Sequence, residues 1–510
     1  MAITDGVVVW TGEDRTGRAL HPGAEEIDLA GAFVAPAFVD THIHTTAFGL
    51  ALVGLDLSEC RSREDCLSRI RRYAERSAEP VIWGHGWDDS SWTDGGPLLT
   101  SDLDDAAPGR AVYLTRVDAH SAACSTPLRE ASALTEVTTG FHPYDPLTSD
   151  AHHAVRAVAK SLLTSDVRAH ARSSTLDFAA SRGICAVHEC GGPDVSGLED
   201  FSELLNTDHG VEVRGYWGQA VTSADQARQL LAETGAHALG GDLFVDGSIG
   251  SHTAWLTEPY ADVGGTGNAF LDVDSIAAHV AACTEAGAQT GFHAIGDGAV
   301  GAIVDALERV ASEVGGPVLA ALGHRIEHME MVSPRQAEKL SAWGVIGSMQ
   351  PMFDELWGGD SALYAFRLGA QRAAGLNPFA RLASAGVSLA FGSDAPVTTL
   401  DPWAMLRAAV NHRTPGSAIS PRAAFSAATR GAWRAGGVRD GLAGTLAAGA
   451  PASYAVWDAD DLVVRAPADS VARWSTDPRA GVAPLPALEP DSPSPRCLRT
   501  VHRGRVIHEA

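Results

Sequence analysis

The 510-residue sequence predicts an α/β protein whose long central part is a parallel sheet with crossover helices. Short apolar strands alternate with helical stretches through the middle of the chain, which is typical of β-α-β units. About 400 residues are enough for an eight-stranded barrel, which needs roughly 250, together with an insertion. Both ends of the chain are β-rich and predict one small sheet domain. The alternation alone fits an open or a closed central sheet.

Seven strands are expected in the middle of the chain because each is a short apolar run bounded by glycine or polar residues. They cover residues 32–40, 183–189, 242–246, 289–295, 321–328, 344–350 and 387–394. Two helices are expected between strands from apolar residues three or four positions apart. One covers 274–285, with Ile276, Val280 and Cys283 on one face, and the other covers 300–310.

Changes in composition predict the domain organisation. Residues 1–35 and 436–510 form the composite domain of the two ends, and residues 36–435 form the central domain. An insertion is expected at about 50–135, where tryptophan, aspartate and proline cluster and the alternation stops. Its tryptophans, Trp83, Trp87 and Trp92, indicate either a core or an aromatic wall over the site.

Composition and charge exclude several classes of protein. The net charge of -25 argues against nucleic-acid binding, because neutralising phosphates needs a basic face. No apolar run reaches the roughly 18 residues of a membrane span, and Asp5 lies where a signal peptide carries positive charge. Seven cysteines without a CxxC pair fit a reducing compartment. We therefore expect a cytoplasmic protein with a small-molecule substrate; a homo-oligomer is compatible with the sequence.

The first polar group at a strand end is the segment from Val39 to His44. Residues i and i+2 of a strand share a face, so His42 and His44 are expected to point together. In GGDLFVDGSIG, Asp242 and Asp246 have the same parity. Two acids on one face of an apolar strand are hard to bury unless they are paired or bound to a metal.

Three further strands end in polar residues. His293 in GFHAIGDGAV is either a metal ligand or a loop histidine that bonds to backbone, and Asp297 follows it. In GHRIEHME, alternation places His324, Ile326 and His328 on one face, the two histidines as ligands or as a hydrogen-bonded core pair. Asp394 ends the last strand, as a ligand or as a helix N-cap.

Together the strand ends supply a set of nitrogen and oxygen ligands for a borderline divalent ion, most simply one or two zinc ions. The candidate metal ligands are His42, His44, Asp242, His293, His328 and Asp394.

The order of the motifs resembles the amidohydrolase superfamily, and more closely its amidohydrolase family 3. The motifs are VAPAFVDTHIH, GWDDSSW, VDAHS, VDGSIGSHTA, HAIGD, RIEH, MQP, GSDAPV and GTLAAGAPA, spread over nearly the whole chain. The resemblance implies a distorted (β/α)₈ TIM barrel and a small β-sandwich formed by both termini. It also implies hydrolysis of C–N bonds other than peptide bonds, in amides, N-formyl groups, N-acyl amines or cyclic amides, at a centre of one or two metals.

The resemblance assigns roles residue by residue, and the sequence departs from the family at one of them. Asp394 matches the aspartate that serves as metal ligand and proton shuttle. Asp242 stands where the family commonly has a carboxylated lysine that bridges two metals. The only lysines are Lys160 and Lys339, so no carboxylated lysine is expected. The N-terminal part of the sandwich is expected to be shortened.

The expected mechanism is attack by a metal-activated water, with Asp394 moving the proton. His324 and His120 are candidates to hold the oxyanion. The candidates to contact substrate are Trp87, His120, Asp246, Asp297 and Gln350, of which the last three fit structural hydrogen bonding as well. The absent lysine leaves two alternatives open: a catalytically impaired barrel that only binds a ligand, and a hydrolase that acts on an ester.

Overall fold

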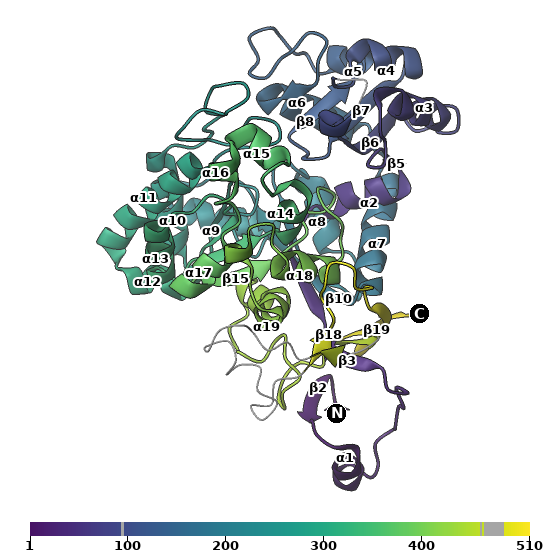
Figure 1. Cartoon of the computed structure of the whole chain (residues 1–510), viewed down its shortest axis with the longest axis vertical. Helices are drawn as coiled ribbons and strands as arrows, with labels where there is room; N and C mark the ends of the chain where they lie inside the picture. Colours follow the sequence, from purple (N-terminus) through teal and green to yellow (C-terminus); the bar gives the residue numbers. More distant parts are fainter. Residues whose placement is uncertain (93–95, 460–461, 464–483) are drawn as a thin grey trace.

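Parallel strands form two sheets at the centre of the computed structural model, which describes residues 1–92, 96–459, 462–463 and 484–510 (Figure 1). One sheet has the strand order β11-β10-β4 and the other has the order β12-β13-β14-β15. The strands are β4 (Phe38–Ile43), β10 (Ile184–Gly191), β11 (Glu212–Trp217), β12 (Gly291–Ala294), β13 (Arg325–His328), β14 (Ile346–Met349) and β15 (Ser388–Phe391). The chain is therefore an α/β protein, as the alternation predicts.

Single backbone bridges connect the edges of the two sheets. On one side, residues 238–245 lie between β11 and β12 and pair through Tyr216–Ala238, Leu239–Thr290 and Phe244–His293. On the other side, Ile43 of β4 pairs with Ala395, just after β15. The strand expected over 242–246 is thus wrong and is replaced by one bridge. Two preceding glycines explain it: Gly240 packs against the backbone of Gly291, and Gly241 has φ +71°.

Helices pack around these strands and bury one large apolar cluster against them. The two predicted helices are confirmed and lie within α10 and α11. Their apolar stripes, Ile276 to Cys283 and Ile303 to Val310, are buried. The helices that cover the parallel strands are α2 (Thr45–Val53), α7 (Ser165–Ser181), α8 (Leu198–Leu205), α9 (Ala224–Thr234), α10 (Val273–Ala286), α11 (Asp297–Val314), α12 (Gly316–Leu322), α13 (Pro334–Ala342) and α17 (Phe379–Ala385).

Shorter helices follow β14 and β15. They are α14 (Pro351–Trp357), α15 (Leu363–Leu368), α16 (Ala370–Ala373), α18 (Pro402–Val410), α19 (Pro421–Ser426) and α20 (Ala432–Ala435). Across the described residues, no helix combines the length and the apolar character needed to cross a membrane.

A separate five-stranded sheet interrupts the chain between β4 and β10 and forms the upper right of Figure 1. Its strands are β5 (Leu55–Asp56), β6 (Val81–Trp87), β7 (Ala111–Arg116), β8 (Ser121–Cys124) and β9 (Leu147–Thr148). Its helices are α3 (Arg63–Ala74), α4 (Thr100–Ala106), α5 (Thr126–Ala131) and α6 (Ser149–Ser161). This insertion has one apolar cluster of its own, and a second cluster packs it against α2 and α7 through Leu50 and Ala171.

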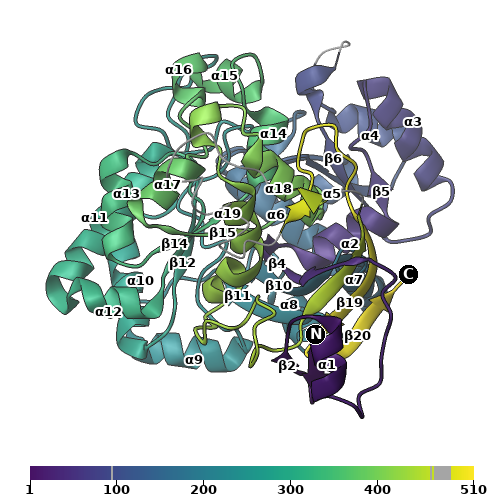
Figure 2. The same ribbon diagram turned by 60° about the horizontal axis from the view of Figure 1, so that its bottom comes forward.

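The two ends of the chain meet in one sheet at the other pole of the molecule (Figure 2). Its strands are β3 (Phe33–Pro36), β16 (Tyr454–Asp458), β19 (Arg496–His502) and β20 (Arg505–Glu509), in the order β20-β19-β16-β3. Two further antiparallel pairs form sheets of their own, β1 (Ala2–Thr4) with β2 (Val7–Trp10), and β17 (Leu462–Val463) with β18 (Leu485–Pro486); α1 (Asp14–Leu20) follows β2.

Candidate metal centre

The histidine pair of β4 lies at the carboxyl end of the parallel strands. His42 is within β4, His44 is the residue before α2, and their rings are 5.3 Å apart. Asp40 accepts hydrogen bonds from the backbone N–H groups of His42, at 3.1 Å, and Ser393, at 2.9 Å. Burial raises the pKa of Asp40 to about 6. This carboxyl group ties β4 to the loop that carries Asp394.

All six predicted ligands come together at this end of the strands. Asp242 is central, because its two oxygens lie 3.4 Å from Nε2 of His42 and 3.3 Å from Nε2 of His44. Its Oδ1 is also 3.5 Å from Nδ1 of His293. Asp394 lies 3.2 Å from Nε2 of His44. The ring of His328 completes the group, 4.9 Å from His42 and 4.4 Å from His293 between centroids.

Two of the predicted ligands lie at strand ends where left-handed backbone directs their side chains toward the centre. His328 has φ +66° and Asp394 has φ +55°. Ile326, two residues before His328, packs in the apolar cluster under the helices, whereas Glu327 faces inward to His42. Simple alternation would therefore direct His328 outward. The predicted shared face of Ile326 and His328 is wrong, and the backbone turn at His328 brings it into the centre.

Two buried side chains fix the orientation of the imidazoles. Oε2 of Glu327 is 3.0 Å from Nδ1 of His42, and Oε1 of Gln350 is 2.8 Å from Nδ1 of His328. A partner on Nδ1 holds the ring and leaves Nε2 directed into the centre, which is the usual support of a metal-binding histidine. Gln350 therefore orients the ring of His328 and does not line the cavity.

The charges of the centre stabilise one another. Burial lowers the pKa of His44, but the carboxylates of Asp394 and Asp242 outweigh this effect and raise it. Burial likewise raises the pKa of Asp394, and the positive charge that His42 and His44 can carry outweighs it and lowers it. A positive centre is therefore favourable beside these two carboxylates.

The residues present fit a divalent metal. Five buried polar atoms of the centre have no hydrogen-bond partner among the described residues, although buried polar groups are nearly always hydrogen-bonded. They are Nε2 of His42, Nδ1 of His44, Oδ1 of Asp242, Nδ1 of His293 and Oδ1 of Asp394. His42, His44 and Asp394, and also His42, Asp242 and His328, offer ligand atoms within 4.8 Å of one another. Such sets of imidazole and carboxylate groups suit zinc.

Two predicted site residues lie away from the centre. His324 precedes β13 at the opposite end from His328, where its ring accepts from the N–H of Thr290 at 3.0 Å and contacts Thr284 at 3.2 Å. The oxyanion role predicted for His324 is therefore wrong. Trp87 donates to the carbonyl of Leu114 at 2.9 Å and lies in the core of the inserted sheet. Its predicted contact with substrate is also wrong.

The two predicted aspartates have structural hydrogen bonds instead of cavity positions. Asp246 is fully buried and accepts from the backbone N–H groups of Trp255, at 2.8 Å, and Ile295, at 3.0 Å. Asp297 begins α11 and accepts from the N–H of Thr257 at 3.0 Å. Both shape the loop after β12, which carries His293, so neither orients the substrate directly.

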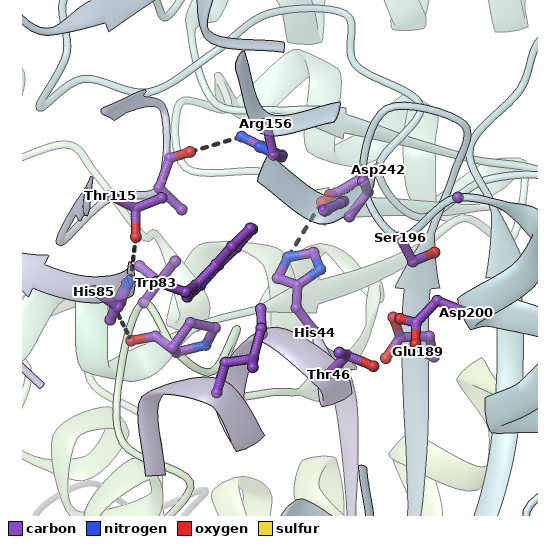
Figure 3. Close-up of a pocket in the computed structure, with 18 of the residues that line it drawn as sticks. His44, Thr46, Trp83, His85, Thr115, Arg156, Glu189, Ser196, Asp200 and Asp242 are labelled. Atoms are coloured by element: carbon purple, nitrogen blue, oxygen red, sulfur yellow. Dashed lines mark hydrogen bonds and ion pairs between the residues drawn. The ribbon is translucent and has the colours of Figure 1, made fainter. Parts of the chain in front are cut away.

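A cavity of about 390 Å³ opens from the centre toward the inserted sheet (Figure 3). His44, Asp242, His293, His328 and Asp394 line one end of it. The residues that line the remainder include Trp83, His85 and Thr115 from the inserted sheet, Arg156 and Lys160 from α6, and Glu189 and Asp200.

His120 is the predicted substrate contact that the structure brings to the cavity. It lines the cavity, and its ring lies 5.3 Å from that of His293. Burial, followed by the nearby His293, lowers the pKa of His120 to about 4. The imidazole is thus neutral at neutral pH.

Sequence reasoning missed Glu327 and Arg156, and it left Trp83 open as a core or a wall residue, of which the structure gives the wall. Glu327 was visible as an acid beside Arg325 in an apolar strand, a pair that needs partners when buried. The pairing with His42 spans 285 positions of sequence, so only the fold reveals it. Trp83 differs from Trp87 by an even number of strand positions, and alternation does not separate a wall residue from a core residue.

Comparison with known proteins identifies the family. A model of the amidohydrolase family matches residues 25–508. Protein LONG AFTER FAR-RED 3 of Arabidopsis thaliana is 28% identical over 446 residues, which are 81% of this chain and 75% of that protein. The solved structure of an uncharacterized metal-dependent hydrolase from Pyrococcus furiosus is 27% identical, with a TM-score of 0.69 and coverage of 90% of this chain and 94% of that chain.

A second solved structure has the same fold. It is an uncharacterized metal-dependent hydrolase from Pyrococcus horikoshii OT3, 23% identical, with a TM-score of 0.69 over 90% of this chain and 93% of that chain. An α/β fold with a cluster of buried imidazoles and carboxylates at its strand ends defines a hydrolase of the metal-dependent class. Since the family model covers nearly the whole sequence, the chain belongs to the amidohydrolase family.

Proposed function

We propose that this protein hydrolyses a C–N bond of an amide, an N-formyl group or an N-acyl amine at a divalent metal centre. The grouping of buried imidazoles and carboxylates around one space, with five of their polar atoms lacking a hydrogen-bond partner, carries the proposal. Membership of the amidohydrolase family supports it. The bridges between the two parallel sheets support a closed, distorted (β/α)₈ barrel, and the sheet shared by both ends supports a small sandwich beside it.

The metal would be held by His42, His44, Asp242, His293, His328 and Asp394. We propose one or two zinc ions, with Asp242 as a direct ligand and no carboxylated lysine. The carboxylate of Asp242 supports this, because it already lies 3.3 to 3.5 Å from three of the histidines. Of the two lysines, Lys339 is 2.7 Å from Glu308 in a partly exposed ion pair, and Lys160 lies on α6 of the inserted segment. When bound, the metal would lower the pKa of a water from about 16 to near 7 and polarise the substrate carbonyl.

The side chains of this protein would carry the proton and steady the developing charge. Asp394 accepts the proton of the attacking water and returns it to the leaving nitrogen, acting first as base and then as acid. Neutral His120 retains one N–H, which donates to the carbonyl oxygen as negative charge develops there. His120 thus takes the role that the sequence also allowed for His324.

Elemental analysis combined with turnover tests this function. Purified protein supplemented with zinc is expected to hold one or two ions per chain and to cleave members of a panel of N-formyl amines, N-acetyl amines and matching esters. Less than about 0.2 metal per chain with no turnover would overturn the proposal, since catalysis by this route requires the ion. Faster cleavage of esters than of every matched amide would redirect it to ester hydrolysis.

Two alanine variants locate the metal. Asp242→Ala is expected to lower the metal content, because Asp242 contacts three of the histidines. Asp225→Ala removes the same carboxylate from an exposed pair with Arg228 on α9 and is the matched control. Equal metal content in the two variants would remove Asp242 from the ligand set.

A further inference from the structure

Helix α6 presents two cationic side chains to the cavity. Arg156 and Lys160 lie one helical turn apart, at positions i and i+4, and therefore share a face of α6. Both line the large cavity that ends at the metal centre. Figure 3 shows Arg156 among the residues that line this cavity, together with His44 and Asp242. The two residues are called the α6 cation pair below.

Arg156 has no acidic partner among the described residues. Its Nη2 donates to the carbonyl of Ala119 at 2.9 Å and also lies 3.3 Å from the ring of His152. Burial and the charge of Arg156 keep the pKa of His152 well below its ordinary value, so this ring is neutral and gives Arg156 no counter-charge. Arg168, another cation that lines the cavity, differs because its Nη2 is 3.1 Å from Glu199.

Lys160 also lacks a partner in direct contact. Its Nζ atom is buried and has no hydrogen-bond partner within the part of the chain that the structure describes. Burial, followed by the charge of Arg156, lowers the pKa of Lys160 to about 7. A buried ammonium without a partner is costly. Asp200 and Glu189 act on Lys160 through their charge but do not hydrogen-bond to its Nζ, so among the described residues neither cation has a carboxylate in direct contact.

We propose that the α6 cation pair binds a carboxylate of the substrate. This inference rests on the proposed hydrolysis and names its substrate class: amides whose larger part carries a carboxylate. An arginine fork and an ammonium one turn apart give a carboxylate several charge-assisted hydrogen bonds. The same carboxylate supplies the counter-charge that both cations lack.

The position of Arg156 connects the anion site to the reaction centre. The Ala119 carbonyl holds its guanidinium next to His120, whose ring lies 5.3 Å from that of His293. A substrate held by Arg156 therefore extends along the cavity toward the metal ligands. Glu189 and Asp200 also line this cavity. Their negative charge favours a singly charged carboxylate over a doubly charged phosphate.

A second, much smaller cavity limits the size of the substrate on the other side of the metal ligands. It measures about 30 Å³ and shares His120, His293, His328 and Asp394 with the large cavity. That volume holds a group about the size of one water or methyl. The reacting carbonyl lies between a small substituent on this side and the larger, charged part in the cavity that α6 lines.

Achiral acetamides test the proposal without a choice of stereochemistry. The zinc-loaded protein is compared on 4-acetamidobutanoate and on N-(4-hydroxybutyl)acetamide, in which a neutral hydroxyl replaces the carboxylate. Arg156→Gln and Lys160→Gln are each expected to lower kcat/KM for the acid about 10- to 100-fold, mainly through KM, as loss of a charge-assisted bond predicts. The neutral amide is expected to change less than about threefold.

Controls separate charge recognition from a structural effect. Lys339→Gln removes one cation from a surface pair with Glu308 and is expected to leave both substrates unaffected. Arg156→Lys is expected to restore part of the preference for the acid, because it returns the charge without the fork. Equal losses on the acid and the neutral amide, or no preference for the acid in the unaltered protein, would overturn the proposal.

A binding measurement distinguishes failure of this inference from failure of the proposed hydrolysis. The sulfonamide 4-(methanesulfonamido)butanoate keeps the carboxylate and resists cleavage, and calorimetry on zinc-loaded protein reports its affinity without turnover. Its Kd is expected to rise at least about fivefold in Arg156→Gln and Lys160→Gln, since each loses a charged partner. Unchanged affinity refutes the anion site. Binding that depends on α6, without cleavage of any amide, refutes the hydrolysis alone.

Discussion

Nδ1 of His42 lies 3.0 Å from Oε2 of Glu327, and both side chains are fully buried. Glu327 is in turn paired with Arg325, whose Nε is 2.6 Å from Oε1. The arginine holds the carboxylate ionised, the carboxylate holds the imidazole, and Nε2 of His42 is left directed at Asp242. The first ligand of the centre is thus positioned by β13, a strand 285 residues later in the chain.

Glu327→Gln is therefore expected to weaken zinc binding about 10- to 100-fold, the usual effect of losing a group that supports a metal-binding histidine. Competition with a chelator measures the affinity. Glu308→Gln removes a carboxylate from a surface pair with Lys339 and serves as the control. If Glu327→Gln bound zinc as tightly as this control, the positioning role would be refuted.

Asp394→Asn is expected to retain metal but to lose turnover. The amide keeps an oxygen in the same place, beside Nε2 of His44, but it does not accept a proton. Loss of a positioned acid–base group lowers kcat about 10²- to 10⁴-fold. Steady-state kinetics and elemental analysis on the same preparation check both statements. An undiminished kcat with normal metal content would remove Asp394 as the proton carrier.

Changing each of the two tryptophans of β6 to phenylalanine is expected to affect a different property of the protein. Trp83→Phe removes part of the cavity wall, so KM for substrates with a bulky large part is expected to rise several-fold. Trp87→Phe removes the hydrogen bond to the carbonyl of Leu114 and is expected to lower the free energy of unfolding by about 1–2 kcal/mol. Kinetics and thermal melting are measured on both, and the reverse pattern would restore Trp87 to the cavity.

Glu212 predicts a pH-dependent attachment of the terminal sheet. Its Oε2 lies 2.8 Å from Arg503 and 3.3 Å from His502 of the terminal strands, and its Oε1 is 2.9 Å from Arg214. Burial opposes ionisation, but His502 and Arg503 outweigh it and lower the pKa of Glu212 to about 2. A carboxyl group that binds its proton more weakly when folded stabilises the protein above its ordinary pKa of about 4.5.

Glu212→Gln is therefore expected to destabilise the protein at pH 7. The loss is limited to about 1–2 kcal/mol because solvent screens the partly exposed pair. The difference from the unaltered protein is expected to shrink by roughly two fifths at pH 3.5 and to vanish below about pH 2. Thermal melting at several pH values measures it, with exposed Glu338→Gln as the control. A difference that stays constant between pH 7 and pH 3.5 would contradict the assignment.

Local sequence predicts the parts of the centre that depend on local geometry. His42 and His44 share a strand end, and their separation of two residues is enough to expect them together. The apolar faces of α10 and α11 follow from the helical period, and both helices form as expected. The resemblance to a family adds the set of ligand positions, which no single motif defines.

Properties that depend on distant contacts or on single backbone angles cannot be predicted from local sequence. The alternation rule assumes extended backbone, so it fails at His328, where φ is positive. It also fails to show that His324, four positions earlier, lies beyond the centre at the other end of the strand. Trp87 and Trp83 share a strand parity, and only the packing of the inserted sheet distinguishes the core residue from the wall residue.

The cavity wall of the inserted sheet and the metal ligands come from separate segments of the chain. Trp83, Thr115, Arg156 and the other cavity residues of that insertion belong to one continuous stretch between β4 and β10. The residues of the metal centre all lie outside that stretch, so it can diverge without disturbing them. Exchange of residues 54–161 between two relatives is expected to transfer the choice of substrate together with His120, and to leave the six metal ligands, including the proton carrier Asp394, in place.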